Sequence, residues 1–281
     1  MESLPSPEGS PRDPTAFSNL GGSSMRAFKI VVSVLSSLVL LSVAAPPAQA
    51  SPRGIPLTCG MVISHDAQLY LAHNLTCPDF GVRVEQDHSG DVPPPNVRID
   101  LRGHTLRGLG TANGIVAFTG GLDVTHVEVV NGRLSNWGNA VGGDYEVRTR
   151  NVALVGNRIG FACGGLGCYA DRTLFKGNTD GGFFVYADAS GSVTRSRFVR
   201  NAVGARVLYI SGLRIEHSSF TRNDVGVLAD DAQVTVSTSR FVRNATAVKV
   251  ITYDDDWPCA TLQHDRFVRN GVNLDGPRCA A

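Results

Sequence analysis

Charged residues are scarce in this sequence, and neither sign is in clear surplus. Lys and Arg number 26 and Asp and Glu 25 among 281 residues, so the net charge is +1 and only 18% of the chain is charged. A near-neutral chain has no global electrostatic attraction for nucleic acid or for an acidic membrane surface. Neither is expected as a partner.

Helix-favouring runs of Glu, Lys and Leu are also scarce, and metal-ligand spacings are missing. The three methionines and seven histidines form no cluster, and no CxxC spacing accompanies a histidine pair, so copper and zinc sites are not supported. Val, Thr, Asn, Asp and 31 glycines are plentiful instead. This composition favours short strands separated by turns and predicts an all-β protein.

The N-terminal segment has the features of a processing signal. A mainly apolar run at 30–45 follows basic residues and precedes the small-residue pattern Ala-Gln-Ala at 48–50, which predicts a secretory signal peptide cleaved after Ala50. The alternative is a membrane anchor, but a span needs about 20 apolar residues and this run is shorter. We expect a secreted or cell-surface protein without membrane contact after cleavage, with translation starting at Met1 or Met25.

All six cysteines follow the expected cleavage point. An even number in an exported protein is typical of disulfides. Sequence alone does not determine the connectivity, and the simplest pairing is Cys59–Cys77, Cys163–Cys168 and Cys259–Cys279. The first and last pairs would staple the ends of a repeat structure, where coils lack a neighbour.

The pattern Phe-x-x-Asn recurs along the second half of the chain. It occurs at Phe175–Asn178, Phe198–Asn201, Phe220–Asn223, Phe241–Asn244 and Phe267–Asn270, with Leu154–Asn157 one step earlier. Successive asparagines are 21, 23, 22, 21 and 26 residues apart, and a repeat near this length is typical of a solenoid. A leucine-rich solenoid is not supported, because its LxxLxLxxN spacing is absent.

Stacking gives the repeat a physical meaning. Asn suits a sharp turn because it tolerates left-handed φ, and coils about 4.8 Å apart would link their asparagines into a hydrogen-bonded ladder. The phenylalanines would form an interior column. We predict a right-handed parallel β-helix of about eight coils with a 21–23-residue repeat over 96–281, an N-terminal cap over 51–95, and a leader and signal peptide over 1–50.

Two N-terminal segments carry a resemblance to a known group of proteins. They run from Cys59-Gly60 to Cys77-Pro78 and from Ile99-Asp100 to Leu106. Together with the repeats, they make the chain over 59–275 resemble the bacterial secreted right-handed parallel β-helix proteins of the pectate-lyase-like superfold. Relatives by fold include pectate lyases, polygalacturonases, alginate epimerases and periplasmic copper-maturation proteins, and fold alone transfers none of their activities.

One outer face of the predicted solenoid carries candidate functional side chains. Residues four and six positions after each Asn are mostly small or apolar and should point inward, so the residue at position five should point outward. These outward residues are Phe183, Arg206, Leu228 and Lys249, followed along the face by Tyr186, Asp188, Tyr209, Asp230, Asp231, Tyr253 and Asp254. Such a groove suits an anionic or neutral extracellular polysaccharide.

The roles of these residues follow from their chemistry. The candidate catalytic residues are Arg206, Lys249, Tyr209 and Asp231. The cations would offset a uronate carboxylate while a tyrosine or an aspartate moves a proton. The candidates for substrate binding are Tyr186, Phe183, Asp188 and Tyr253. A solvated face with mixed charges carries the same residue types without such a role, so both interpretations stay open.

Two acidic clusters occur at Asp230-Asp231 and Asp254-Asp255-Asp256. They could hold calcium, which takes six or more oxygen ligands, or form the carboxylate pair of an inverting glycosidase, about 6.5–9.5 Å apart. Consecutive aspartates more often mark an exposed turn, which is the favoured interpretation. Calcium aside, no cofactor is expected.

A column of arginines precedes the asparagines at one offset: Arg200, Arg222, Arg243 and Arg269. Stacked on one side, these side chains would repel each other unless neighbouring aspartates, backbone carbonyls or an anionic glycan offset their charge. The favoured alternative is that they are simply exposed and screened by salt.

Two classes of function remain. The turn segments between 157 and 250 are short, and extended insertions occur only near 83–96 and 252–264, whereas enzymes of this fold usually have long loops around a groove. We therefore expect a monomeric, non-catalytic glycan-binding or structural module. The alternative is a lyase, epimerase or hydrolase acting on an acidic extracellular polysaccharide.

Overall fold

The computed structural model describes residues 54–85, 94–118, 126–144, 146–165, 167–209, 211–253 and 258–279. The expected signal peptide lies outside these residues, as do Asp254, Asp255 and Asp256. Within the described ranges, no helix is both long and apolar enough to cross a membrane.

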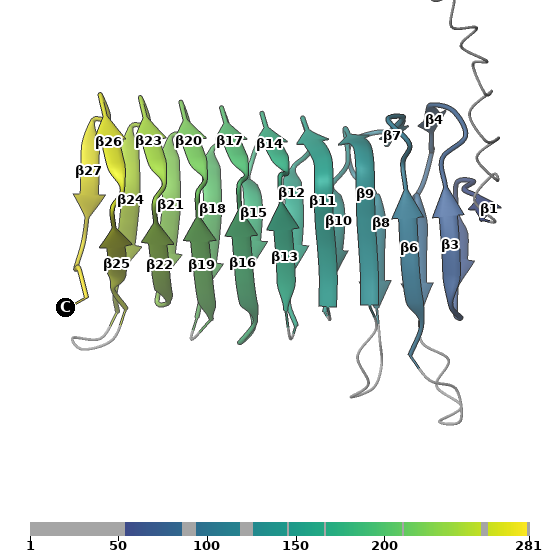
Figure 1. Ribbon diagram of the computed structural model, residues 1–281, viewed down its shortest axis with the longest axis horizontal. Coiled ribbons are helices and arrows are strands. Elements are labelled where there is room, and N and C mark those ends of the chain that lie inside the picture. The colour runs from purple at the N-terminus through teal and green to yellow at the C-terminus, as the bar shows by residue number, and fades with distance from the viewer. Residues whose placement is uncertain are drawn as a thin grey trace, which may run out of the picture. The chain divides into compact units, whose positions relative to one another are not determined.

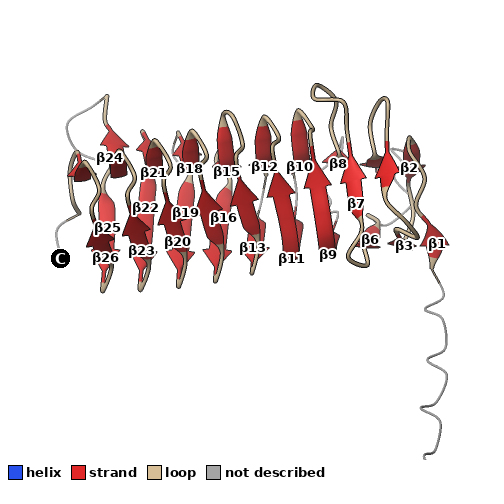
Figure 2. Ribbon diagram, turned by 90° about the horizontal axis from the view of Figure 1, so that it is seen from above, coloured by secondary structure: helices blue, strands red, loops and turns tan. Residues whose placement is uncertain are grey.

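The described residues form a parallel β-helix, which confirms the predicted fold. Two parallel sheets of 17 and 10 strands, here called sheet A and sheet B, run the length of the stack. A coil contributes two segments to sheet A, its first and second limbs, and then one strand to sheet B. Figures 1 and 2 show the coils side by side from β1 to β27, each continuing the sheets of the previous one.

The strand bounds follow this order. The first limb of sheet A contains β1 (Ile55–Pro56), β3 (Ala67–Tyr70), β6 (Asn96–Asp100), β13 (Cys168–Asp171), β16 (Ser190–Thr194), β19 (Gly212–Glu216), β22 (Gln233–Ser237) and β25 (Ala260–Gln263). The second limb contains β4 (Leu75–Thr76), β7 (Thr105–Arg107), β14 (Leu174–Lys176), β17 (Arg197–Val199), β20 (Ser219–Thr221), β23 (Arg240–Val242) and β26 (Arg266–Val268). Two long strands, β9 (His126–Ser135) and β11 (Glu146–Val155), extend through both limbs.

Sheet B contains one strand from each coil. Its strands are β2 (Met61–Ile63), β5 (Val82–Glu85), β8 (Ile115–Phe118), β10 (Asn139–Gly143), β12 (Ile159–Cys163), β15 (Gly181–Val185), β18 (Val203–Leu208), β21 (Val225–Asp230), β24 (Thr246–Ile251) and β27 (Val272–Asp275). Eight of them, from β8 onward, lie between residues 96 and 275, as the repeat predicted.

The predicted aromatic column fills the interior of the C-terminal coils. The rings of Phe175, Phe198, Phe220, Phe241 and Phe267 stack in sequence with centroids 4.5, 4.4, 4.8 and 5.1 Å apart. The first four are fully buried. The rings lie one coil apart, so burial of one ring depends on its neighbours in the coils on either side.

The asparagine ladder is also confirmed. The Asn201 side-chain oxygen accepts the backbone N–H of Asn178 at 3.0 Å, and its Nδ2 donates to the carbonyl of Phe175 and to Oδ1 of Asn223, both at 3.1 Å. The same contacts recur from Asn157 to Asn270. Each buried amide thus satisfies backbone groups in adjoining coils, which fixes the stacking register.

The left-handed backbone conformation was predicted for the asparagines, and this was wrong. It occurs at the residue before each of them, with φ between 53° and 63°. At the asparagine corner these residues are Gly156, Gly177, Arg200, Arg222, Arg243 and Arg269. The asparagine amide points into the ladder, so the sharp turn falls on its predecessor.

A second ladder, which was not predicted, lies at the corner between the two limbs of sheet A. The backbone N–H groups of Thr173, Ser196 and Ser218 donate to the hydroxyl of the next coil at 3.1, 3.1 and 3.0 Å. The Ser239 N–H donates to Asp265 at 2.7 Å. Burial raises the pKa of Asp265, although this backbone hydrogen bond opposes the shift.

The three predicted disulfides are present. Cys59 bonds to Cys77, Cys163 to Cys168, and Cys259 to Cys279. The first joins the first coil to the second, and the last lies at the C-terminal end of the stack. These bonds constrain the coils that stacking stabilises least.

Candidate functional site

Phe183 does not lie on the outer face, contrary to the prediction. It is fully buried, with edge-to-face contacts to Phe161 at 5.1 Å and to Phe175 at 6.1 Å. Its neighbour Phe184 takes the outward position and pairs in register with Arg206. One extra residue between Asn178 and β15, compared with the next coil, shifts the alternation by one and reverses every side chain.

The two cations of the predicted groove do lie on the outer face of sheet B, but both have acidic partners. Arg206 forms an ion pair with Asp230 at 2.7 Å, and Lys249 Nζ lies 3.4 Å from Asp275. Each aspartate belongs to the next strand of the sheet. The charge that would offset a substrate carboxylate is therefore already balanced within the protein.

Two tyrosines, Tyr209 and Tyr253, lie beside Asp230 of this pair. Tyr209 and Tyr253 are 59% and 68% exposed, and the Tyr253 hydroxyl hydrogen-bonds to Asp230. The negative charge of Asp230 is the main cause that raises the pKa of Tyr253, and this hydrogen bond adds to it. We call Tyr209, Asp230 and Tyr253 the tyrosine cluster.

The other predicted groove residues lie at the same end of sheet B. Tyr186 is half-buried beside Phe184, with ring centroids 5.9 Å apart, and burial raises its pKa. Asp188 and Asp231 both adopt positive φ, at 60° and 52°. This conformation is typical of turn aspartates.

The Tyr253 phenol is expected to ionise above its usual pKa near 10. The Asp230→Asn variant should lower that pKa, because it removes the negative charge that opposes phenolate formation. Ultraviolet titration of phenolate, taken as the difference between each protein and the same protein carrying Tyr253→Phe, isolates this group. An unchanged difference curve in Asp230→Asn would contradict the assignment, and Asp188→Asn is the matched control.

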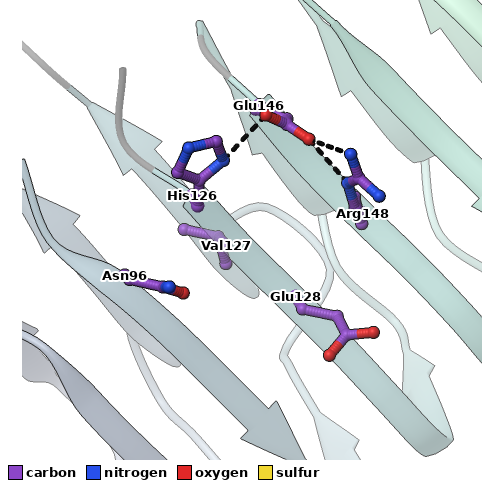
Figure 3. A pocket seen from close by; sticks show the side chains of 6 residues that line it. All are labelled: Asn96, His126, Val127, Glu128, Glu146 and Arg148. Carbon is purple, nitrogen blue, oxygen red and sulfur yellow. Dashed lines mark hydrogen bonds and ion pairs between the residues drawn. The ribbon is translucent and has the colours of Figure 1, made fainter. Parts of the chain in front are cut away.

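A charged hollow lies on the outer face of the first limb, away from the predicted groove. Figure 3 shows one part of it, about 480 Å³ in volume, lined by Asn96, His126, Val127, Glu128, Glu146 and Arg148. An adjoining hollow of about 500 Å³ shares Asn96 and Glu128 and adds Asp66, Ala67, Gln68 and Arg98. The two together, here called the sheet A hollow, cross β3, β6, β9 and β11.

Each glutamate of the hollow is held between two basic side chains. Glu146 Oε2 lies 2.7 Å from His126 Nδ1, and its Oε1 accepts a hydrogen bond from Arg148 Nε at 2.6 Å. Figure 3 shows this arrangement, with Glu146 between its two partners. Glu128 pairs with Arg98 on one side and with Arg150, at 3.1 Å, on the other.

The hollow is also lined by amide groups, and an aromatic ring lies next to it. The backbone N–H of Asn96 donates to Asp66 at 2.8 Å, while its side-chain amide belongs to the lining of both parts. The Arg148 guanidinium lies 4.6 Å from the ring centroid of Tyr169, which is 39% exposed on the next strand. The hollow thus presents hydrogen-bond donors and acceptors, and an aromatic ring lies beside it.

The sequence contained a signal for this site that position-by-position reading missed. His126 and Glu146 are 20 residues apart, which is one coil, and they pair directly in register. Arg98 and Glu128 are 30 residues apart and are likewise register partners, because an insertion lengthens that coil. Residues separated by one repeat are neighbours in a solenoid, so charges compared at that period would have predicted the His126–Glu146 pair but not the Arg98–Glu128 pair.

Among the residues that the structure describes, no three His, Cys, Asp or Glu side chains converge as a metal site. The calcium hypothesis rested on Asp230-Asp231 and on Asp254-Asp255-Asp256, and the second group lies outside the described residues. Neither the groove nor the sheet A hollow therefore supplies an argument for a metal.

Comparison with solved structures supports the architecture. The fold is similar to that of a phage tailspike. The match is to the full-length tailspike protein 2 of Escherichia coli O157:H7 bacteriophage CAB120, with a TM-score of 0.50 and 9% sequence identity. It covers 73% of this chain but only 34% of the tailspike, and at this identity the likeness concerns the fold alone.

Sequence comparisons find nothing similar: no protein-family description matches the chain, and no curated protein is significantly similar to it. The three disulfides are consistent with an extracellular location, since such bonds persist in oxidising compartments. Function therefore has to be argued from the sites themselves.

Proposed function

We propose that this protein is an extracellular, non-catalytic glycan-binding β-helix and that the sheet A hollow holds the sugar. The observation that carries the proposal is the alternation of carboxylates and guanidinium groups across adjacent strands of a partly exposed surface. Sugar hydroxyls both donate and accept hydrogen bonds, so such a surface matches them group by group.

Pre-organisation supports binding at this site. Ion pairs between register partners hold the side chains of Arg98, Glu128 and Glu146 in place before a ligand arrives. A ligand therefore has less side-chain freedom to remove, which lowers the entropic cost of binding. The Tyr169 ring beside Arg148 offers an apolar surface for the face of a sugar ring.

The same contacts argue against acid–base catalysis in the hollow. Both oxygens of Glu146 are engaged, one by His126 and one by Arg148. Glu128 is engaged by two arginines. A general acid or base must exchange a proton with the substrate, and each oxygen of these two carboxylates already has a basic partner within the protein.

The tyrosine cluster supports the enzyme alternative less well. The raised pKa keeps Tyr253 protonated at neutral pH, whereas a proton-abstracting phenol must be ionised. Arg206 and Lys249 are paired with aspartates rather than free to bind a uronate. The alternative stays testable: incubation of the protein with polygalacturonate and alginate, followed by the absorbance of unsaturated products, would reveal a lyase.

The Arg148→Ala variant is expected to weaken glycan binding by roughly tenfold or more, since a hydrogen bond to a charged group contributes about 1.5–3 kcal/mol. Arg214→Ala is a matched control, because Arg214 lies in the same outer column of the first limb and pairs with Glu216 as Arg148 pairs with Glu146. Binding is measured by calorimetry with glycans selected on an array of neutral and acidic chains. Equal losses in both variants, or no glycan bound on the array, would overturn the proposal.

A further inference from the structure

A second surface, on the other limb of sheet A, carries only positive charge. We propose that it binds a linear acidic polysaccharide lying along the stack of coils. This site is separate from the sheet A hollow, and the proposal does not depend on glycan binding in the hollow.

The surface is defined by eight exposed cations on five successive coils. They are Lys176, Arg197, Arg200, Arg222, Arg240, Arg243, Arg266 and Arg269, here called the arginine face. Arg197, Arg240 and Arg266 share one outward column of the second limb, together with Ser219. The four other arginines occupy the adjoining corner.

No carboxylate lies among these columns. The outward positions between the cations are filled by Leu174, Val199, Ser219, Thr221, Val242 and Val268. The first limb is different, because its acidic residues Asp171 and Glu216 alternate with arginines and pair with them. Acidic residues are thus concentrated on the limb where pairing occurs.

The arginine face is also unpaired. Within the described ranges, none of its eight side chains has an ion-pair partner, whereas ten ion pairs form elsewhere in the same part of the chain. The nearest acidic residues along the chain are Asp224 and Asp265. Neither forms an ion pair with an arginine of the face, and Asp265 accepts the backbone N–H groups of Ser239 and Gln263. The charge repulsion foreseen in the arginine column is therefore left uncompensated by the protein.

The backbone at the corner shows that arginine is not there for the turn. Arg200, Arg222, Arg243 and Arg269 have φ of 55°, 56°, 55° and 53°, a conformation that costs an L-residue about 1–2 kcal/mol and that Gly adopts freely. Two earlier coils do use glycine at this position, Gly156 and Gly177. Four consecutive coils instead place an arginine there, and each of these side chains is exposed and has no ion-pair partner among the described residues.

The geometry favours a linear polymer. Successive coils repeat about every 4.8 Å, so the arginine face presents a regular row of guanidinium groups rather than a pocket. Guanidinium groups bind carboxylate and sulfate in a bidentate manner. A polyanion lying along the row would meet a cation at each coil, and its release of counterions would favour binding at low salt.

An acidic polysaccharide fits better than single-stranded nucleic acid. Nucleic-acid platforms combine cations with exposed aromatic rings on which bases stack. The large exposed aromatic residues of the described chain are Phe118, Tyr169, Tyr209 and Tyr253, and none of these belongs to the second limb or its asparagine corner.

The test substitutes glycine for arginine at positions where glycine suits the backbone. The double variant R222G/R243G is expected to bind polygalacturonate about tenfold more weakly than the unmodified protein at low salt, with a flatter salt dependence. The matched control is R172G/R195G, because Arg172 and Arg195 also have positive φ, 47° and 49°, but lie at the other corner. This control should retain the affinity.

Three outcomes would overturn the proposal: no binding of polygalacturonate at low salt, an equal loss in R172G/R195G, or equal affinity for an amylose chain of the same length. Tighter binding of oligothymidylate than of polygalacturonate would assign the face to nucleic acid instead. Circular dichroism and the melting temperature show whether each variant is folded. The R148A variant should keep its polygalacturonate affinity, which separates this proposal from that for the sheet A hollow.

Discussion

Replacing Asn201 with alanine is expected to lower the free energy of unfolding by about 3–5 kcal/mol. The substitution removes the acceptor for the Asn178 N–H and the donor to the Phe175 carbonyl, both inside the stack. Each buried polar group left without a partner costs about 1–3 kcal/mol. The side chain also bonds to Asn223 in the following coil, so the ladder is interrupted on both sides.

Urea unfolding followed by circular dichroism measures this loss. Asn273→Ala serves as the control, because Asn273 is exposed in the last coil and bonds only to the end of the ladder, Asn270. The control should change stability by less than about 1 kcal/mol. Similar losses in the two variants would show that the ladder contributes no more than a surface amide.

Replacing Phe183 with alanine is expected to cost about 3–5 kcal/mol, the range for a large buried aromatic. Phe184→Ala should cost much less, about 1 kcal/mol, since that ring is half-exposed and its contacts are with Arg206 at 5.3 Å and Tyr186 at 5.9 Å. The two residues are adjacent and chemically identical, so the pair is its own matched control.

Thermal and urea unfolding of both variants decides which ring faces the core. The opposite order of stability would restore the alternation expected from the sequence and contradict the placement of β15. Phe183→Leu should recover much of the lost stability, because leucine refills part of the cavity between Phe161 and Phe175.

The fold was predictable because its main contacts are spaced by the repeat itself. Asn201 and Phe198 lie one repeat from Asn223 and Phe220, so a single period in the sequence predicts both the hydrogen-bonded ladder and the aromatic column. Three local cysteine pairs made the disulfides predictable in the same way. In both cases the spacing of residues along the sequence was enough to predict the contact.

The errors arose where spacing is interrupted or where residue identity varies. Counting a fixed number of residues from each asparagine does not detect the extra residue after Asn178. The prediction therefore assigned Phe183 to the outer face, although it is buried. The second ladder changes from Thr173 to serines and then to Asp265, so no single letter repeats. The sheet A hollow depends on partners such as Arg98 and Glu128, which an insertion separates by 30 residues.

The asparagine ladder also implies that the molecule can be lengthened or shortened only by whole coils. Removing residues 202–223 would join Asn201 to Asp224, so that Phe198 would meet Phe241 and Asn201 would meet Asn244 with the contacts each now makes one coil away. Single-residue insertions shift the alternation, whereas a complete coil added or lost leaves it intact. The number of coils can therefore change without a change of fold. Each coil added or removed within the arginine face would lengthen or shorten that face by one step.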